Sequence, residues 1–530
     1  MPEDQRVHPP DIPNRLPRVA GVLIPLSSLR TAEDLGRGEI LGLIPFFDFA
    51  LAMRHRFVLL LPLGESAAGE ASPYSALSVF AIDPLYISLS GVEGISAADL
   101  DRARAAVGRS SAGRRRRLVF DAKLPLLKQS FRHFAQHSSA ERRAELDRFV
   151  EANRGWLPDY ALFRALKDRM EWRSWEEWPE GLRSRDEAAL TRARGELAEP
   201  IAMYTYWQFL AHRQWDDVRA AAEQRGVLLG GDLSFSPGRD SAEVWTNRHL
   251  FKLERSVGAP PDGFNPKGQR WGLPMPDWER MRSDGFAWWR TRVRDACNLF
   301  DLFRIDHVVG LYRTFSFGPD LNQPGEYWPA DEKDQKEHGE NFIRVIVDEA
   351  RDRLVIAEDL GAVPDWVRES LTRFGIPGYK VMRWEKKKID PASAVETYIP
   401  PADYPELSLA TTGTHDTETL IQWWGELSET ERADFARAMG LAERLDPKQE
   451  TLSDPALEAI LETLYQSPAR LVVAPIQDLF GWRTRINLPG TVRDSNWAYR
   501  LPADLARLGR DFAIRTRQAK LSAIVERSGR

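Results

Sequence analysis

The sequence has few of the features that would tie the chain to a disulfide framework or to a membrane. It contains one cysteine, Cys297, which excludes an intrachain disulfide and a cluster of thiolate metal ligands. No apolar run approaches the ~20 residues of a membrane-spanning helix, and residues 1–18 lack the apolar centre of a signal peptide. We therefore expect a flexible N-terminal tail at 1–18 on a cytoplasmic protein with no membrane partner.

Cofactor motifs and a strong charge of one sign are also missing. The nine histidines form no His-Glu-x-x-His zinc motif, and no Gly-x-x-x-x-Gly-Lys phosphate loop occurs. We therefore expect no metal and no other cofactor. The net charge of −5 provides no basic field for a nucleic acid, and we interpret the basic runs at 114–117 and 386–388 as solvated surface loops. The sequence does not predict an oligomeric state.

What the chain does have is a series of short apolar segments bounded by turn residues. With 530 residues, of which 43% are hydrophobic, it can bury a large core. Eight segments have the pattern of buried strands, at 19–26, 57–61, 227–233, 302–306, 354–358, 379–384, 407–412 and 471–476. Helical patterns separate several of them, for example at 341–351, 364–374 and 428–439. This alternation predicts an α/β fold, a (β/α)8 TIM barrel whose chemistry lies at the carboxyl ends of its strands.

The spacing of these strands is uneven, which predicts insertions in the strand-to-helix loops. We expect a mainly α-helical subdomain at 64–200, and the catalytic barrel at 19–63 and 201–530. A second long stretch, 234–289, is rich in Gly, Pro and Trp and is expected to be a wall of the site built from loops. The last residues, 505–530, have the pattern of an amphipathic helix.

Three of the predicted strands end in or shortly before a carboxylate, at Asp306, Glu358 and Asp416. On the first strand, Arg304 shares a face with Asp306 and can hold that carboxylate ionised, which suits a nucleophile. On the second, Ile356 shares a face with Glu358, and an apolar setting raises a carboxyl pKa, which suits a general acid. A glycosidase requires two carboxyl groups, one ionised to act as the nucleophile and one protonated to act as the general acid. Asp416 is left for another role.

Each acid alone also has a purely structural explanation. Arg304 and Asp306 could form a plain ion pair, and the pair Glu358-Asp359 could be a solvated loop or a helix cap. Asp416 could cap a helix that starts near Thr417. We favour a shared site because three independent structural accidents at three strand ends are a less economical explanation.

The tryptophans favour a sugar substrate. Of the 18 in the chain, several fall in or beside loops expected to follow barrel strands, at 271, 328, 384, 423, 424, 482 and 497. Indole rings pack on the apolar faces of pyranose rings while neighbouring polar groups bind hydroxyls. The alternative, that individual tryptophans fill the core between barrel and helices, stays open at this point.

The order of the motifs resembles the 4-α-glucanotransferases of glycoside hydrolase family 77, also called amylomaltases or disproportionating enzymes. The resemblance runs from about Arg18 to Leu501. It is carried by the motifs SPYS at 72–75, GGDL at 230–233, DSAEVW at 240–245, GAPPD at 258–262, GQRWG at 268–272, RIDH at 304–307, AEDLG at 357–361, GTHD at 413–416 and NLPGT at 487–491. Segments after Asp232 and His307 depart from the family pattern, which leaves donor length and acceptor choice open.

The resemblance implies an enzyme that passes a glucosyl or maltooligosyl piece of an α-1,4-glucan to another sugar, with α-1,4-glucans and maltooligosaccharides as its partners. It implies that Asp306 is the nucleophile, Glu358 the general acid/base and Asp416 the acid that stabilises the transition state. It further implies a set of substrate-binding residues, namely Tyr74, Asp262, Trp271, Arg304, His307, His415 and Asn487. Two alternatives are a retaining hydrolase or phosphorylase-like relative of the amylase group, and a catalytically inactive glucan-binding barrel.

Overall fold

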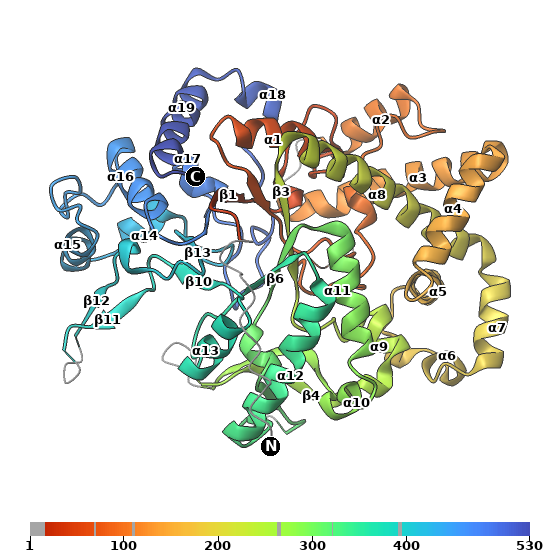
Figure 1. Ribbon diagram of the computed structural model, residues 1–530. Helices are drawn as coiled ribbons and strands as arrows, with labels where there is room; N and C mark the ends of the chain where they lie inside the picture. The colour runs from red at the N-terminus through yellow and green to blue at the C-terminus, as the bar shows by residue number, and fades with distance from the viewer. Residues whose placement is uncertain are drawn as a thin grey trace.

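The predicted strands form the centre of the molecule. In the computed structural model, which describes residues 16–67, 70, 72–108, 112–261, 267–320, 322–390 and 395–530, parallel strands close into a barrel in the order β1-β14-β13-β10-β9-β6-β3-β2 (Figure 1). They are β1 Val19–Leu23, β2 Phe57–Leu59, β3 Leu228–Leu233, β6 Leu302–Ile305, β9 Leu354–Ala357, β10 Gly378–Val381, β13 Ser408–Thr411 and β14 Leu471–Pro475. The predicted fold class is confirmed, and each strand falls within a predicted segment or begins one residue before it.

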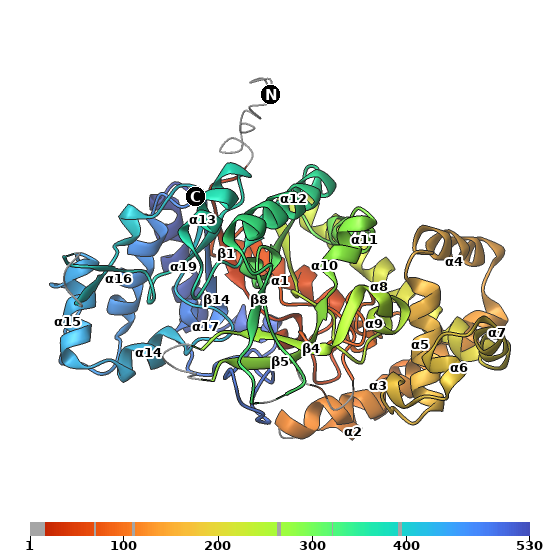
Figure 2. The same ribbon diagram turned by 90° about the horizontal axis from the view of Figure 1, so that it is seen from below.

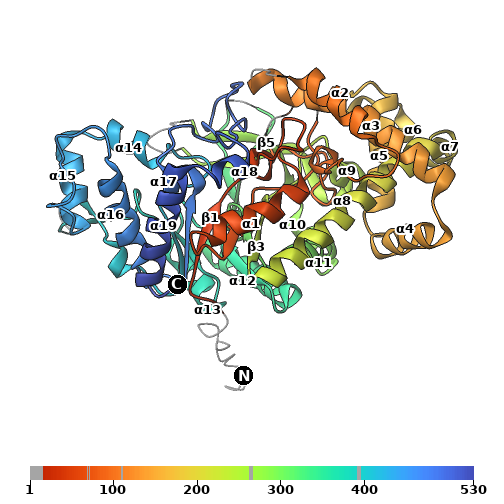
Figure 3. The same cartoon turned by 90° about the horizontal axis from the view of Figure 1, so that it is seen from above.

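Helices surround this barrel. Figure 3 shows α1, α8, α11 and α19 along its outside. The helices after the first strands of the barrel are α1 Leu43–Leu51, α8 Ala198–Arg225, α9 Ala242–Thr246, α10 Trp278–Ser283, α11 Ala287–Leu299, α12 Glu332–Ala350 and α13 Asp365–Arg373. Those nearer the C-terminus are α14 Leu420–Glu426, α15 Glu429–Ala438, α16 Asp454–Tyr465, α17 Ile476–Phe480, α18 Leu505–Leu508 and α19 Phe512–Arg527. The predicted C-terminal helix is thus broken in two, because Asp511 caps the start of α19 by accepting from the Ile514 backbone N–H.

A second group of helices lies to one side of the barrel, opposite α14–α16 (Figure 2). It comprises α2 Ala97–Val107, α3 Ala112–His137, α4 Ala140–Ala152, α5 Leu157–Arg169, α6 Glu180–Arg183 and α7 Glu187–Glu196. We keep the division into a barrel and a helical subdomain at 64–200 as a proposal; its second boundary falls inside α8. Residues 1–15 of the predicted tail lie outside the described residues. Within the described residues, no helix is both long and apolar enough to cross a membrane.

The stretch 234–289 is not a wall of loops, which corrects that expectation. It contains β4 Phe251–Ala259 and β5 Gln269–Pro276, which join β7 Thr314–Phe317 and β8 Glu326–Trp328 in an antiparallel sheet of order β5-β4-β7-β8. The glycines that suggested loops are needed by the strands, since a Cβ on Gly258 would lie 1.8 Å from the Gln269 carbonyl oxygen. The basic runs also lie in regular elements and not in loops, the first within α3 and the second in β11 Lys386–Lys388, which pairs with β12 Glu396–Tyr398.

A buried ion pair ties α3 to the barrel. The Lys123 side chain is fully buried and donates to Glu39 Oε1 and to the Leu85 carbonyl, each at 2.7 Å. Removing one partner of a buried pair leaves an uncompensated charge. We therefore expect Lys123→Met to lower the free energy of unfolding, measured by urea denaturation, by about 3–5 kcal/mol.

The matched control for this variant is an exposed pair at the C-terminal end of α4, formed by Glu151 of the helix and Arg154 just after it. Arg154 and Glu151 lie 2.6 Å apart with both side chains at least 70% exposed. Arg154→Met should change the same free energy by less than about 1 kcal/mol, because water screens such pairs. Equal effects of the two substitutions would contradict the account of Lys123.

Candidate active site

The three predicted acids follow barrel strands at the same end of the barrel. Strands β6 and β9 pair in parallel with Ile305 opposite Ala357, so Asp306 and Glu358 follow side by side. The Glu358 backbone N–H donates to the Ile305 carbonyl at 3.0 Å, which continues the pairing to the acid itself. Asp416 follows β13, and only β10 separates β13 from β9. The parallel barrel thus brings together side chains that are far apart in the sequence.

Arg304 connects the acids. Its buried guanidinium donates through Nη2 to Asp306 Oδ1 at 2.7 Å, and the same nitrogen lies 4.0 Å from Glu358 Oε2. Nη1 donates to both carboxylate oxygens of Asp232, each at 2.7 Å. Burial acts to lower the Arg304 pKa, but the charges of Asp232 and Asp306 outweigh burial and raise it well above its ordinary value. Arg304 therefore stays protonated and fixes the Asp306 carboxylate on its strand.

Glu358 lies in the opposite electrostatic setting. Burial raises its pKa to about 8, although the charge of Arg304 and a 2.7 Å hydrogen bond from the His307 backbone N–H to Oε2 both act to lower it. Its side chain is 13% exposed. At neutral pH Glu358 is therefore protonated and able to donate a proton.

Asp416 is held as a carboxylate. Burial acts to raise its pKa, but the charge of His415 and hydrogen bonds from His415 and Asn487 lower it to about 2. Asn487 Nδ2 donates to Oδ1 at 2.6 Å, and His415 Nε2 lies 3.2 Å from Oδ2. The side chain does not cap a helix, since the residue that caps α14 is Thr419. The side chain is 40% exposed.

Three aromatic side chains pack next to these acids. The Tyr74 hydroxyl donates to Asp232 Oδ2 at 2.6 Å and lies 3.1 Å from His415 Nε2. The Tyr74 ring stacks on the His415 ring, with centroids 5.4 Å apart, and Trp497 contacts both rings. Tyr74 thus joins the Arg304 network to the Asp416 network. The cluster presents flat apolar surface beside hydrogen-bonding groups, which is the chemistry that a sugar needs.

His307 lies beside Glu358, and Trp271 packs on His307. The His307 backbone has φ +47°, an unfavourable left-handed conformation for this residue, and this conformation directs its N–H to Glu358. Burial lowers the His307 pKa to about 4, so the ring is neutral at physiological pH. Trp271, on β5, packs edge-on against it with centroids 4.8 Å apart. The structure thus places every predicted site residue at this mouth except Asp262, which lies outside the described residues.

Sequence reasoning missed Asp232 and Trp497 as members of the site. Asp232 had a usable signal, because it falls near the end of β3 in the same pattern that singled out the other acids. Burial raises its pKa, whereas the charge of Arg304 and the Tyr74 hydrogen bond lower it. Trp497 was noted only as one of many tryptophans. Its position depends on the loop that follows β14, with φ +60° at Trp497 itself, and no sequence pattern predicted this.

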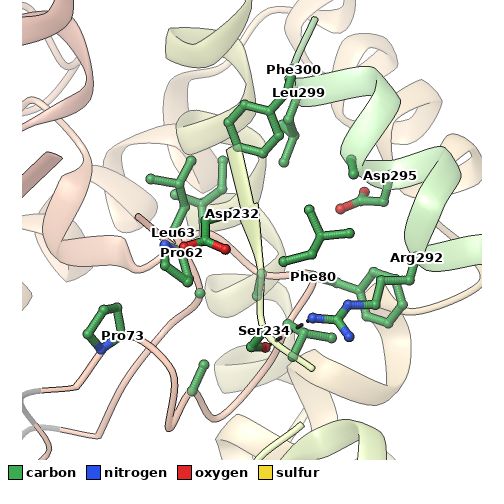
Figure 4. Close-up of a pocket in the computed structure, with 17 residues that line it drawn as sticks. Pro62, Leu63, Pro73, Phe80, Asp232, Ser234, Arg292, Asp295, Leu299 and Phe300 are labelled. Carbon is green, nitrogen blue, oxygen red and sulfur yellow. Dashed lines mark hydrogen bonds between the residues drawn. The ribbon is translucent and has the colours of Figure 1, made fainter. Parts of the chain in front are cut away.

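A small cavity lies next to Asp232, between β3 and α11. It has a volume of about 50 Å³ and is bounded by β3, α11 and the loops after β2 (Figure 4). Figure 4 shows Arg292 of α11 extending to Ser234, and its Nη2 donates to the Ser234 hydroxyl at 3.0 Å. A space of this size holds ordered water but no sugar ring. The cavity is therefore part of the packing around Asp232 and is not a binding site for a sugar.

The described residues contain no group of three His, Cys, Asp or Glu side chains arranged to hold a metal ion. His133 and His137 lie one turn apart on α3, which is the spacing of a two-histidine metal site. No third ligand joins them within the described part of the chain.

A parallel barrel that carries two carboxyl groups on neighbouring strands beside one guanidinium, one of them with a pKa raised to about 8 by burial, has the features of an enzyme that processes glycosidic bonds. The sequence model of the 4-alpha-glucanotransferases matches residues 24–506, and the chain belongs to this family.

Individual relatives agree with this assignment. The chain is 34% identical over 508 residues to the 4-alpha-glucanotransferase of Thermus thermophilus, covering 93% of this chain and 96% of the relative. It is 32% identical over 503 residues to that of Chlamydia pneumoniae, covering 92% of each. Among solved structures, the amylomaltase from Streptococcus agalactiae in complex with acarbose superimposes with a TM-score of 0.82 at 28% identity, covering 97% of this chain and 99% of that one.

Proposed function

We propose that this 4-alpha-glucanotransferase moves a glucosyl or maltooligosyl segment of an α-1,4-glucan to the 4-hydroxyl of another glucan or of glucose, with retention of configuration. One observation carries the proposal. A single guanidinium nitrogen, Arg304 Nη2, contacts Asp306 and approaches Glu358, so that both acids reach one sugar ring while burial keeps Glu358 protonated. A retaining double displacement requires these two roles, a nucleophile and a general acid/base.

In the first step, Glu358 donates its proton to the glycosidic oxygen while Asp306 attacks the anomeric carbon. The bond from that carbon to the leaving oxygen breaks, a bond to the Asp306 oxygen forms, and the shortened glucan leaves with the proton. The Arg304 bond keeps the attacking oxygen oriented. Glu358 is left ionised.

In the second step, Glu358 acts as the base. It removes the proton from the 4-hydroxyl of an incoming glucan, whose oxygen attacks the anomeric carbon, and Asp306 departs as a carboxylate. Two inversions restore the original α configuration. Both proton transfers use the same carboxyl group, so Glu358 returns to its starting state after each cycle.

Asp416 and its neighbours support the sugar ring during both steps. With a pKa of about 2, Asp416 is a permanent carboxylate that can accept hydrogen bonds from ring hydroxyls and stabilise positive charge at the anomeric carbon. Asn487 and His415 orient it, and Tyr74, Trp271 and His307 are proposed to contact the substrate. Asp262 is kept as a further candidate contact. A cytoplasmic location stays a prediction from the single cysteine.

Incubation with maltotriose alone tests this function. Transfer should yield glucose together with longer maltooligosaccharides, while the total number of reducing ends stays constant. The Asp306→Asn protein, purified in the same way, is the control for contaminating enzymes. A steady rise in reducing ends would instead identify a hydrolase, and retained glucan binding without turnover would identify an inactive glucan-binding barrel.

A further inference from the structure

The loop that carries the third acid depends on side chains for its position. Strand β13 ends at Thr411, so the segment 412–418, which we call the Asp416 loop, lies beyond the ladder of the barrel. It also carries His415. Two arginines from outside the loop donate to three of its backbone carbonyl groups.

Arg383 holds both ends of the Asp416 loop. It follows β10, the strand on one side of β13, and its side chain is buried. Nε donates to the Thr412 carbonyl and Nη1 donates to the Glu418 carbonyl, each at 2.8 Å. The fit is close, since a Cβ on Gly413 would lie 2.9 Å from Arg383 Nη2. One guanidinium thus fixes the distance between the two ends of the loop.

Arg485 holds the middle of the loop from the other side. It lies in the segment after β14, the second neighbour of β13. Nη2 donates to the Asp416 carbonyl at 2.7 Å, and Nε donates to the Asn487 carbonyl at 2.6 Å. Asn487 in turn donates to the Asp416 carboxylate. Arg485 therefore fixes the Asp416 backbone and also the backbone of Asn487, the residue that donates to the Asp416 carboxylate.

Two carboxylates keep these cations together. Glu418 Oε2 lies 3.7 Å from Arg383 Nη1, and Glu418 Oε1 lies 3.3 Å from Arg485 Nη1. Asp478 lies 3.8 Å from Arg383 Nη2 and accepts from the Thr412 hydroxyl at 2.6 Å. Glu418 and Asp478 thus balance the charges of Arg383 and Arg485, and neither arginine pairs with the Asp416 carboxylate, whose side chain is 40% exposed.

We propose that Arg383 and Arg485 are positioning residues that clamp the Asp416 loop from the strands on either side and thereby place Asp416 against the reacting sugar. The inference rests on the proposed function, because it assigns a role to residues that touch no substrate. A misplacement of about 1 Å in a group that stabilises the transition state costs roughly 100-fold in rate. The clamp should therefore govern kcat more than KM.

The test is Arg485→Ala with maltotriose as substrate. We expect kcat to fall roughly 100-fold and KM to change less than about threefold, because the lost interaction acts in the transition state. Guanidinium ions at a concentration that does not denature the protein should restore at least part of kcat. The same ions should not restore Asn487→Ala, which leaves no guanidinium-shaped space. Arg485→Lys, which keeps the charge, serves if the alanine variant does not fold.

Arg483→Ala is the matched control, because Arg483 lies two residues away in the same segment with an exposed side chain. It should keep the wild-type kcat. The clamp is refuted if kcat of Arg485→Ala stays within twofold of wild type, if only KM changes, or if guanidinium gives no recovery. Absence of transfer by the wild-type protein would instead contradict the proposed function, so the two failures are distinct.

Discussion

Asp306→Asn should reduce kcat for transfer from maltotriose by at least about 10⁴-fold, as expected for loss of a nucleophile. The amide lacks the charge and nucleophilicity of the carboxylate, so the bond to the anomeric carbon does not form. Folding should survive the change. Arg304 keeps both hydrogen bonds to Asp232, and the Asp306 side chain is partly exposed rather than buried. The rate of glucose release from maltotriose measures the effect.

Asp301 provides the matched control for this substitution. It precedes the same strand, β6, at the end away from the barrel mouth, where its carboxylate accepts from the Leu229 backbone N–H and pairs with Arg353. Asp301→Asn should leave kcat within about threefold of wild type, since no group of the site touches it. Transfer by purified Asp306→Asn above about 1% of the wild-type rate would show that another group is the nucleophile.

The second large effect concerns Glu358. Its pKa is raised to about 8, and the first step requires its protonated form, so kcat/KM should fall as the pH rises through this value. The fall should approach tenfold per pH unit once Glu358 is mostly ionised. A profile of kcat/KM for maltotriose across neutral and alkaline pH measures it. An alkaline limb centred near the ordinary glutamate pKa would contradict the burial argument.

Glu358→Gln tests whether ionisation of Glu358, and not of another group, causes the fall in kcat/KM at alkaline pH. The glutamine cannot donate a proton, so kcat/KM for maltotriose should fall by about 10²–10⁴-fold and the alkaline limb at about pH 8 should disappear. The first step with α-maltotriosyl fluoride should be far less affected, because fluoride leaves without protonation. Persistence of the limb in this variant would assign the titration to a different group.

Much of the site could be predicted because its physical causes are local in the sequence. Short apolar runs define barrel strands, and the strand period places Arg304 beside Asp306. The apolar neighbour Ile356 predicted a raised Glu358 pKa, and burial is its main cause in the structure. The roles of these acids stay proposals, but their convergence follows from the parallel barrel.

Other features arise from contacts between distant segments and had no local signal. The low pKa of Asp416 depends on Asn487, which is 71 positions further along the chain. The bonds from Arg383 and Arg485 go to backbone carbonyl groups, and any residue type supplies a carbonyl, so no pattern marks the partner. The glycines of β4 and its neighbour misled the prediction because glycine serves both loops and closely packed strands.

The most direct test of the mechanism is to trap the proposed covalent intermediate. Glu358→Gln incubated with α-maltotriosyl fluoride should form the glycosyl-enzyme quickly and release it slowly, since no base then activates an acceptor. Mass spectrometry of the digested protein should find one maltotriosyl group, attached to Asp306. A maltotriosyl group on any other residue, or turnover of the fluoride with inversion and no adduct, would contradict the account.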